Sequence, residues 1–397
     1  MLEKTSFSQI NRRVDRPVIL FGSGNIAKKT YRKLGYERVA FIVDSSKNLQ
    51  GTQFEGLEIF SPERVSRDYF VIICSTAISD ISKVLEQKGL TPNKDFASSP
   101  ILNDLLAISE LEQIQTTFYF TSGTATPPNA KYGGGLYRCE VSSTEVHLEK
   151  CYAGPCYGAT AVGENLFFVD TDRGLIEYDG ESFTLRTAFP DGSRAHGISY
   201  HAGSGQFYVA CSYLDAVLTV QPDFTLGKSY NLSKKREQHG EPMHHCNDVL
   251  ALGESVYVSM FSSTGNWKYD SFDGCIAEFD RITGDRLADV YQGLYMPHNI
   301  KYFDGALHIL DSLPGHLRFN NFAVQGTFPA FTRGLDYKNG LYYVGQSKNR
   351  NYSKVMGLSN NISIDCGVII FNPELHVSRF IQFPYTIGEI HAIVVKS

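Results

Sequence analysis

The sequence predicts an α/β plus all-β chain: a short Rossmann-like N-terminal domain followed by a six-bladed β-propeller. A buried strand, a glycine-rich turn and a helix near the start of the chain indicate the first domain. A hairpin pattern that recurs along the remainder, with alternating strands around a short turn, indicates the propeller. Its clearest copy is Met296–Ser312, where Asp304 and Gly305 form the turn. We place the domains at residues 1–112 and 113–397.

Composition narrows the class of protein. The chain has 397 residues, of which 42% are hydrophobic, enough for more than one core. A formal net charge of -5 without a long basic run argues against nucleic acid or an anionic membrane as partner. The polar N-terminus lacks a signal-peptide core, no apolar run is long enough to span a membrane, and the eight cysteines form no C-x-x-C pair. We therefore expect a reduced, cytoplasmic protein, with an oligomer left open.

A dinucleotide-binding pattern follows the first buried strand, Val18–Phe21. The turn reads G-x-G-x-x-A and opens a helix, and the next strand, Val39–Asp44, ends in an acid. Glycines let the backbone approach a pyrophosphate, the helix start faces the anion, and the acid accepts from a ribose hydroxyl. Another buried strand ends next to Ser75, at the edge where open α/β sheets bind ligands. The predicted nucleotide contacts are Gly22, Gly24, Asn25, Asp44 and Ser75.

The segments FGSGNIAKK and FIVDSS resemble those of small Rossmann-like domains in bacterial sugar-modifying and glycan-biosynthesis proteins, including sugar acetyltransferases. The resemblance implies that a nucleotide or nucleotide-sugar can bind. The domain is about half the size of a full Rossmann fold and offers no second half to hold a nicotinamide. A module that binds nothing is therefore the open alternative, and redox use of NAD is disfavoured.

The number of blades follows from a strand left over at the C-terminus. Five four-stranded repeats fit between Gly154 and Tyr385, and one inner strand, Glu389–Lys396, remains. One strand cannot form a blade, but three strands between Thr117 and Cys151 match the missing ones in order. We therefore predict six blades, the last closed by strands from both ends of the domain, which protects the sheet edges.

Four motifs link the second domain to a known group of proteins. MPHNIKY with LHILDS, FTRGLDY with YYVGQSK, CGVIIFN and IGEIHAI resemble a group of bacterial proteins whose propeller is related to the gluconolactonase and senescence-marker fold. The resemblance implies the fold and leaves the biochemical role open. Gluconolactonase-type enzymes use a Glu/Asn/Asn/Asp metal set, for which only Asn247 and Glu389 are clear candidates here, so calcium lactonase chemistry does not carry over.

The first residues of the inner strands should form a ring around the central funnel. Imidazoles from three alternate blades suit one divalent metal, zinc before calcium or manganese, with one position left open. At the other ring positions, Tyr157 offers an acid or base, Asn247 an amide and Arg333 an anion clamp. Glu389 is a further base or ligand. The layout is similar to that of peptidylglycine amidating lyase, whereas side chains that merely satisfy backbone groups or channel water are the alternative. The predicted metal ligands are His196, His298 and His391, and the predicted catalytic residues are Tyr157, Asn247, Arg333 and Glu389.

Long loops should gather at the same face of the propeller. They lie at residues 122–135, 262–274 and 348–365, and their aromatic and cationic side chains suit a sugar or an anionic ligand. The cluster His244, His245 and Cys246 is secondary, because neighbours on a strand point in opposite directions. The loop side chains in question are Trp267, Tyr269, Lys348 and Arg350.

These patterns favour an enzyme: a metal-assisted lyase, hydrolase or epimerase acting in the funnel on a carbohydrate or nucleotide-linked sugar. A non-catalytic propeller that binds a glycan or a partner is the first alternative. An NAD-dependent oxidoreductase built on the first domain is the second.

Overall fold

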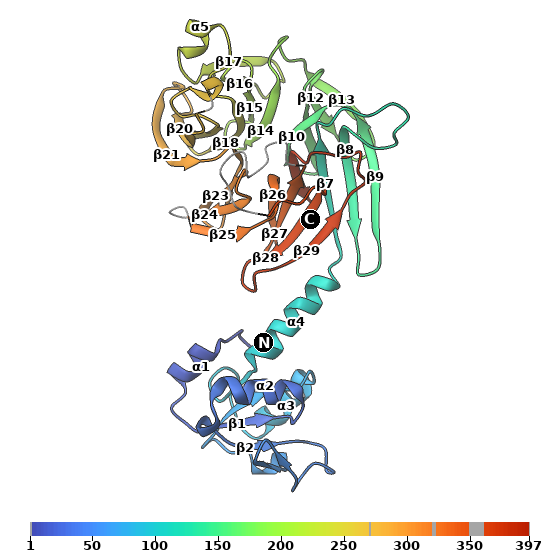
Figure 1. Ribbon diagram of the computed structural model, residues 1–397, viewed down its shortest axis with the longest axis vertical. Coiled ribbons are helices and arrows are strands. Elements are labelled where there is room, and N and C mark those ends of the chain that lie inside the picture. The colour runs from blue at the N-terminus through green and yellow to red at the C-terminus, as the bar shows by residue number, and fades with distance from the viewer. Residues whose placement is uncertain (1, 270, 320–322, 349–360, 397) are drawn as a thin grey trace. The chain divides into compact units, whose positions relative to one another are not determined.

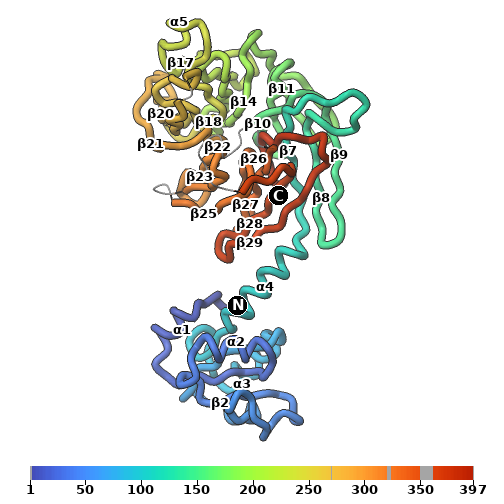
Figure 2. The backbone as a smooth tube through the Cα atoms, in the orientation of Figure 1, coloured from blue at the N-terminus to red at the C-terminus, as the bar shows by residue number. Residues whose placement is uncertain are grey.

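The computed structural model describes residues 2–269, 271–319, 323–348 and 361–396, so Arg350 lies outside the described residues. The chain forms two compact units, Met1–Glu112 and Gln113–Ser397 (Figures 1 and 2). Within the described ranges, no helix is both long and apolar enough to cross a membrane.

The first unit is built on a mixed six-stranded sheet with the order β3-β4-β2-β1-β5-β6. All neighbouring strands are parallel except β3, which pairs antiparallel with β4. The strands are β1 (Val18–Phe21), β2 (Val39–Val43), β3 (Gln53–Phe54), β4 (Leu57–Phe60), β5 (Phe70–Ile73) and β6 (Phe96–Ser98). The helices are α1 (Phe7–Arg13), α2 (Asn25–Leu34), α3 (Ile78–Gln87) and α4 (Pro100–Glu112), with 3-10 turns η1 (Tyr36–Arg38) and η2 (Pro62–Arg64).

Both faces of this sheet are covered. Along β1, Val18 and Leu20 pack into a core with side chains of α1 and α2, while Ile19 and Phe21 pack into a second core with α3. A strand buried on both faces needs apolar side chains at every position, which explains the uninterrupted run VILF.

The second unit is a propeller of six four-stranded antiparallel sheets, as predicted. In the sixth sheet the last strand, β30, pairs with β7, the first strand of the unit, so that Ala392 lies opposite Thr121 (Figure 1). The predicted closure by both ends of the domain is therefore present.

The strands of each blade follow from the innermost to the outermost, blade by blade. They are β10 (Cys156–Val162), β11 (Asn165–Asp170), β12 (Gly174–Tyr178), β13 (Phe183–Thr187); β14 (Ala195–His201), β15 (Gln206–Cys211), β16 (Ala216–Val220), β17 (Leu226–Asn231); β18 (Cys246–Leu252), β19 (Ser255–Met260), β20 (Gly274–Asp280), β21 (Arg286–Leu294); β22 (Pro297–Phe303), β23 (Ala306–Asp311), β24 (His316–Phe319), β25 (Ala323–Thr327); β26 (Phe331–Lys338), β27 (Leu341–Ser347), β28 (Gly367–Asn372), β29 (Val377–Gln382); and β30 (Ala392–Val395), β7 (Thr116–Ser122), β8 (Gly135–Val141), β9 (Val146–Ala153). Two short helical segments, α5 (Lys235–His239) and η3 (Trp267–Tyr269), lie in its connections.

The inner strands of the first five blades share an irregular start. Each shows a shift in register against the second strand of its blade within its first few residues. Such a bulge turns side chains out of the regular alternation and leaves N–H groups without a ladder partner. The shifted segments contain the residues that the sequence places around the funnel.

Polar side chains of neighbouring blades bind several of these N–H groups. The N–H of Ile300 donates to Asp248 Oδ2 at 2.9 Å, and that of Gly334 donates to Asn299 Oδ1 at 2.6 Å. The blades approach so closely that a Cβ at Gly197 would lie 2.5 Å from Asp248 Cα. Glycine and short polar residues on these strands thus link the blades to one another around the axis.

Asp248 makes the stability of the propeller depend on pH. Burial raises the pKa of its carboxyl from 3.8 to about 6, so the folded protein holds a proton that the unfolded chain releases. This contribution to stability is present below pH 3.8 and is lost as the pH rises through 6, a change of about 3 kcal/mol. We expect Asp248→Asn to flatten this part of the pH profile and to raise stability at pH 7.5. Denaturant unfolding at pH 4.5 and 7.5 measures both effects, and an unchanged profile would contradict the assignment.

Candidate functional site

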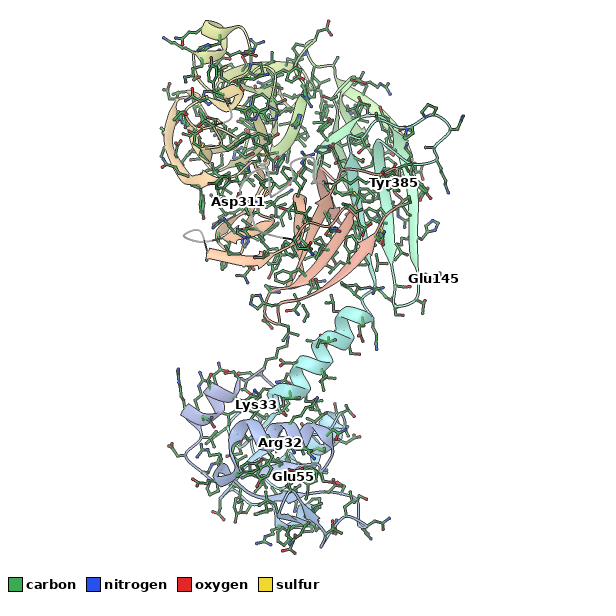
Figure 3. All side chains as sticks on the ribbon, viewed as in Figure 1. Arg32, Lys33, Glu55, Glu145, Asp311 and Tyr385 are labelled. Atoms are coloured by element: carbon green, nitrogen blue, oxygen red, sulfur yellow. The ribbon has the colours of Figure 1, made fainter. Side chains whose placement is uncertain are left out.

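Two cavities meet at the funnel of the propeller. The channel cavity, of about 160 Å³, runs between the inner strands and is lined by His196, Asn247, His298 and His391 among others. The rim cavity, of about 580 Å³, is lined by Arg194, Lys348, Tyr385, Glu389 and parts of the loop after β7. Tyr157 lines both cavities. Tyr385, labelled in Figure 3, is 83% exposed.

A buried carboxylate stands at the wall of the rim cavity. Glu389 is 5% exposed, its Oε2 lies 2.9 Å from His391 Nε2, and its Oε1 lies 3.5 Å from Arg333 Nη1. Arg333 also packs over the ring of Phe331 at 4.7 Å. The carboxylate is therefore held in one orientation by two groups that come from different blades.

The ring of Tyr157 lies between two imidazoles. Its centroid is 4.2 Å from that of His391 and 4.5 Å from that of His196. On another side the backbone of the loop after β7 approaches so closely that a Cβ at Gly123 would lie 2.7 Å from Tyr157 Cζ and 3.0 Å from His391 Nε2. Only glycine at position 123 leaves room for this pair of rings.

Burial keeps His196 and His298 neutral. It lowers the pKa of His196 and of His298 well below the ordinary value, with nearby His391 as the next cause for His196 and Arg333 for His298. His298 Nδ1 lies 2.9 Å from the carbonyl oxygen of Met296 and 2.8 Å from Ser312 Oγ. The carbonyl can only accept, so a proton on Nδ1 satisfies it and leaves the lone pair on Nε2. Neutral imidazoles can bind a metal or accept a hydrogen bond.

The three predicted metal ligands all line the channel cavity but do not form a closed set. The rings of His196 and His391 are 6.1 Å apart, and His391 Nε2 faces Glu389. His298 packs against Phe261 and Phe331. Within the described ranges no group of three or more His, Cys, Asp or Glu side chains is arranged to hold a metal ion. The three-histidine site therefore stays a prediction.

His245, which the sequence treated as secondary, lies beside the channel residue His196. It is 9% exposed, its ring stacks on Trp267 at 4.4 Å and 21°, and it lies 6.3 Å from the ring of His196. Burial lowers its pKa to about 3. Its φ of 53° turns the backbone, so the alternation of a strand does not apply to it. We name His245, Trp267 and Phe261, which lies 4.6 Å from His245, the aromatic shelf.

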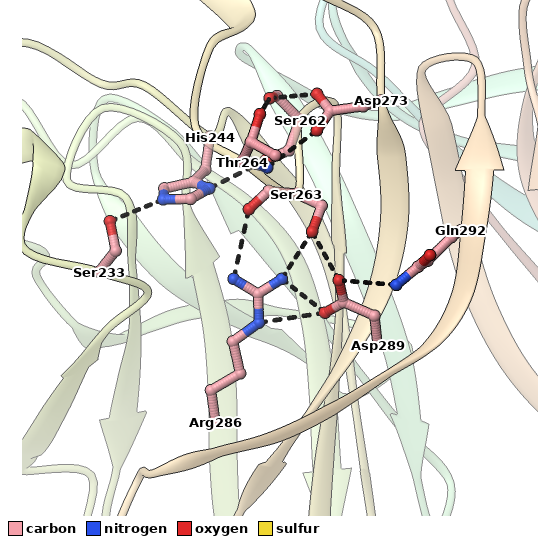
Figure 4. Close-up of polar contacts among 9 residues, drawn as sticks. All are labelled: Ser233, His244, Ser262, Ser263, Thr264, Asp273, Arg286, Asp289 and Gln292. Carbon is pink, nitrogen blue, oxygen red and sulfur yellow. Dashed lines mark hydrogen bonds and ion pairs between the residues drawn. The ribbon is translucent and has the colours of Figure 1, made fainter.

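A hydrogen-bond network holds the aromatic shelf in place, and Figure 4 shows the part of it around His244, Ser262 and Asp273. Asp215 accepts from the N–H groups of Met243, His244 and His245. The His244 ring lies 2.9 Å from the carbonyl oxygen of Ser262 and 2.7 Å from Ser233 Oγ. Ser262 Oγ in turn donates to Asp273, so both ends of the loop that carries Trp267 are tied down. Asn247 belongs to the same segment, and its Nδ2 donates to the carbonyl oxygen of His245 at 3.2 Å.

The first unit has a cavity of its own, of about 240 Å³, at the carboxyl ends of β1, β2 and β5. Three predicted nucleotide contacts, Gly22, Asp44 and Ser75, line it together, whereas Gly24 and Asn25 begin α2 and are not among the lining residues. The carboxylate of Asp44 accepts from the N–H and hydroxyl of Ser23 at 3.0 and 2.7 Å. It thereby supports the glycine turn of this chain.

Comparison with known proteins identifies a family. Residues 179–397, more than half of the chain, match the family described as "Domain of unknown function (DUF4915)". The chain belongs to the DUF4915 family. The four motifs beginning at Met296, Phe331, Cys366 and Ile387 all fall within the matched residues.

The DUF4915 match covers most of the site. His196, Asn247, His298, Glu389 and His391 lie within it, as does Arg333, whereas Tyr157 lies before its first residue. The funnel is therefore formed mainly by the matched residues, and the inner strand of the first blade and the loop after β7 complete it.

Three solved structures are similar to parts of this chain. A nidogen/laminin complex is 14% identical, with 71% of this chain and 98% of that chain covered and a TM-score of 0.49. A calcium-binding protein, regucalcin, from Agrobacterium tumefaciens str. C58 is 11% identical, with 56% and 72% covered and a TM-score of 0.40. A luciferin-regenerating enzyme is 12% identical, with 61% and 91% covered and a TM-score of 0.41. No curated protein matches the chain.

Proposed function

We propose that the propeller funnel is the active site of a lyase, hydrolase or epimerase that acts on a small carbohydrate-type ligand. The observation in its support is Glu389, a buried carboxylate held by Arg333 and His391 at the wall of the rim cavity. Asp215 is a buried carboxylate that binds backbone N–H groups, whereas Glu389 faces two ionisable side chains beside a cavity. Such an arrangement is typical of a group that moves a proton.

Glu389 is the base in this proposal, and it takes a proton from the ligand or from a water bound beside it. His391 and Arg333 are positioning residues that fix the carboxylate through its two oxygens. Tyr157 lines both cavities, so its hydroxyl can return a proton to the departing or inverted group. Asn247 lines the channel behind them and offers its amide oxygen to ligand hydroxyls.

Incubation with a panel of sugar acids, sugar lactones and nucleotide-linked sugars, followed by NMR, tests this function. Conversion of any member supports an enzyme. Saturable binding without conversion of any member supports the alternative of a non-catalytic, glycan-binding propeller instead.

The zinc-type metal at His196, His298 and His391 is a separate proposal, and no step above depends on it. A bound divalent ion would polarise a carbonyl or activate water. Its support is that all three imidazoles line one cavity and that burial keeps His196 and His298 neutral. We expect element analysis to find about one metal per chain, lost in His298→Ala and kept in His147→Ala, a change on the exposed strand β9. A folded protein without metal would contradict it.

We propose that the first unit is a Rossmann-like domain and that its cavity binds a nucleotide or nucleotide-sugar. The favouring observation is that Gly22, Asp44 and Ser75 line one cavity at the carboxyl edge of parallel strands. We expect calorimetry of the full chain to detect ADP or UDP-glucose, and Ser75→Phe, which fills the cavity, to weaken binding at least tenfold. Reduction of bound NAD by a substrate would favour the oxidoreductase instead, and no binding of any of these nucleotides would refute the site.

A further inference from the structure

The charged groups around the rim cavity leave an excess of positive charge. Arg194 and Lys348 line it, and Glu389, the one acid among its described lining residues, already faces Arg333 and His391. Arg194 donates to the hydroxyl of Tyr213 at 2.7 Å, and Lys348 Nζ donates to the carbonyl oxygen of Tyr385 at 2.5 Å, both neutral partners. The chain as a whole is negative, with a net charge of -5. A local excess of cations on an acidic protein favours an anionic ligand.

Two buried imidazole nitrogens, one on a side chain that lines the channel cavity and one on its neighbour, have no protein partner in the described ranges. They are His196 Nε2 and His245 Nδ1, on side chains that are 8% and 9% exposed and whose rings lie 6.3 Å apart. A buried polar atom without a hydrogen bond costs about 1–3 kcal/mol, so such atoms are normally satisfied by water or by a ligand. Each nitrogen can be matched by a ligand hydroxyl.

His245 is held in an unfavourable backbone conformation. Its φ of 53° is uncommon for a residue other than glycine, and the N–H to Asp215 and the stack on Trp267 maintain it. The bonds of Ser262 to His244 and to Asp273, drawn in Figure 4, fix both ends of the loop that carries Trp267. The ring is thus oriented beside His196 by a rigid support rather than by chance.

We propose that the funnel binds an anionic monosaccharide, with its acidic group at Arg194 and Lys348 and its hydroxyls at His196 and His245. This proposal rests on the proposed function of the funnel and specifies the ligand by charge. Tyr157 connects the two halves of this site, because it lines the rim cavity and its ring lies 4.5 Å from that of His196.

The chain contains a single tryptophan, Trp267, which lies in the aromatic shelf and so reports on this site. We would titrate the full-length protein with D-glucuronate, D-glucose 6-phosphate and D-glucose, and follow Trp267 fluorescence and calorimetric heat. The expected result is saturable binding of an acidic sugar at least tenfold tighter than binding of glucose. The two acidic probes distinguish a carboxylate from a phosphate as the recognised group.

Arg194→Gln and His245→Ala should each weaken acidic-sugar binding about tenfold or more. Arg173→Gln is the matched control, because this exposed arginine also donates to a tyrosine hydroxyl, that of Tyr152 at 3.1 Å, but lines neither cavity. Thermal unfolding shows whether each variant is folded. Arg194→Lys keeps the charge and should retain most of the affinity. It therefore tests the role of the charge even if His245→Ala does not fold.

Glucose binding as tightly as the acidic sugars would overturn the proposal, as would acidic-sugar binding that Arg194→Gln leaves unchanged or no binding of either acidic probe at millimolar concentration. If the proposed function fails while this inference holds, an acidic sugar binds but is not converted. Conversion of a neutral sugar would uphold the function and overturn this inference.

Discussion

Replacing Glu389 by glutamine should lower the rate of substrate conversion by about 10²–10⁴-fold, the range typical of a lost proton-transfer group. The amide has the shape of the carboxylate and can still accept from Arg333 with its oxygen, but it cannot take up a proton. Because the same atoms still contact the ligand, we expect kcat to fall more than affinity. Steady-state kinetics on the substrate found by the panel, together with its dissociation constant, measures both quantities.

Two controls separate a chemical role from a structural one. Glu164→Gln changes an exposed glutamate in the turn between β10 and β11 and should leave kcat unchanged. Thermal unfolding of Glu389→Gln shows whether the loss of charge next to Arg333 weakens the fold. A folded variant that keeps more than half of the wild-type kcat would remove Glu389 from the role of base.

Much of the propeller can be predicted because its signals are local. Alternating strands and turn residues define each hairpin, and the single inner strand left at the C-terminus requires partners from the start of the domain. The pairing of Ala392 with Thr121 confirms that reasoning. The lining of the channel by His196, Asn247, His298 and His391 also follows from the repeat, since equivalent positions of equivalent strands face one axis.

Side-chain partners inside the funnel could not be predicted in the same way. His298 packs against Phe261 and Phe331 of neighbouring blades, and His391 faces Glu389 within the segment that precedes β30. A repeat pattern gives the position of a residue on the ring but not the direction of its side chain. The predicted metal set assumed that three equivalent positions imply three converging nitrogens.

His245 was underestimated for a definite physical reason. The rule that neighbours on a strand point in opposite directions holds for extended backbone, whereas His245 has a φ of 53°. Nothing in the letters HHC reveals that conformation. Its causes are Asp215, which lies in another blade, and Trp267, which lies in a loop. The loop was expected at this face from its length, but its contact with His245 depends on tertiary structure.

Replacing Asp215 by alanine should lower the free energy of unfolding of the propeller by on the order of 5 kcal/mol, since three buried N–H groups lose their acceptor at about 1–3 kcal/mol each. The carboxylate is 1% exposed and accepts from Met243, His244 and His245. The same change should release the aromatic shelf. Denaturant unfolding followed by fluorescence measures both, because the one tryptophan of the chain lies in the propeller and reports that unit alone.

The size of this effect should depend on how many acceptors remain. Asp215→Asn keeps one acceptor oxygen but places an NH₂ group against an N–H donor, so it should be about half as destabilising. Asp223→Ala removes an exposed aspartate of the same blade that accepts from the N–H and hydroxyl of Thr225, and should cost at most about 1 kcal/mol. Equal losses in Asp215→Ala and Asp223→Ala would mean that the segment 243–245 holds its conformation without Asp215, and that the aromatic shelf is fixed by packing against Phe261 and Trp267 instead.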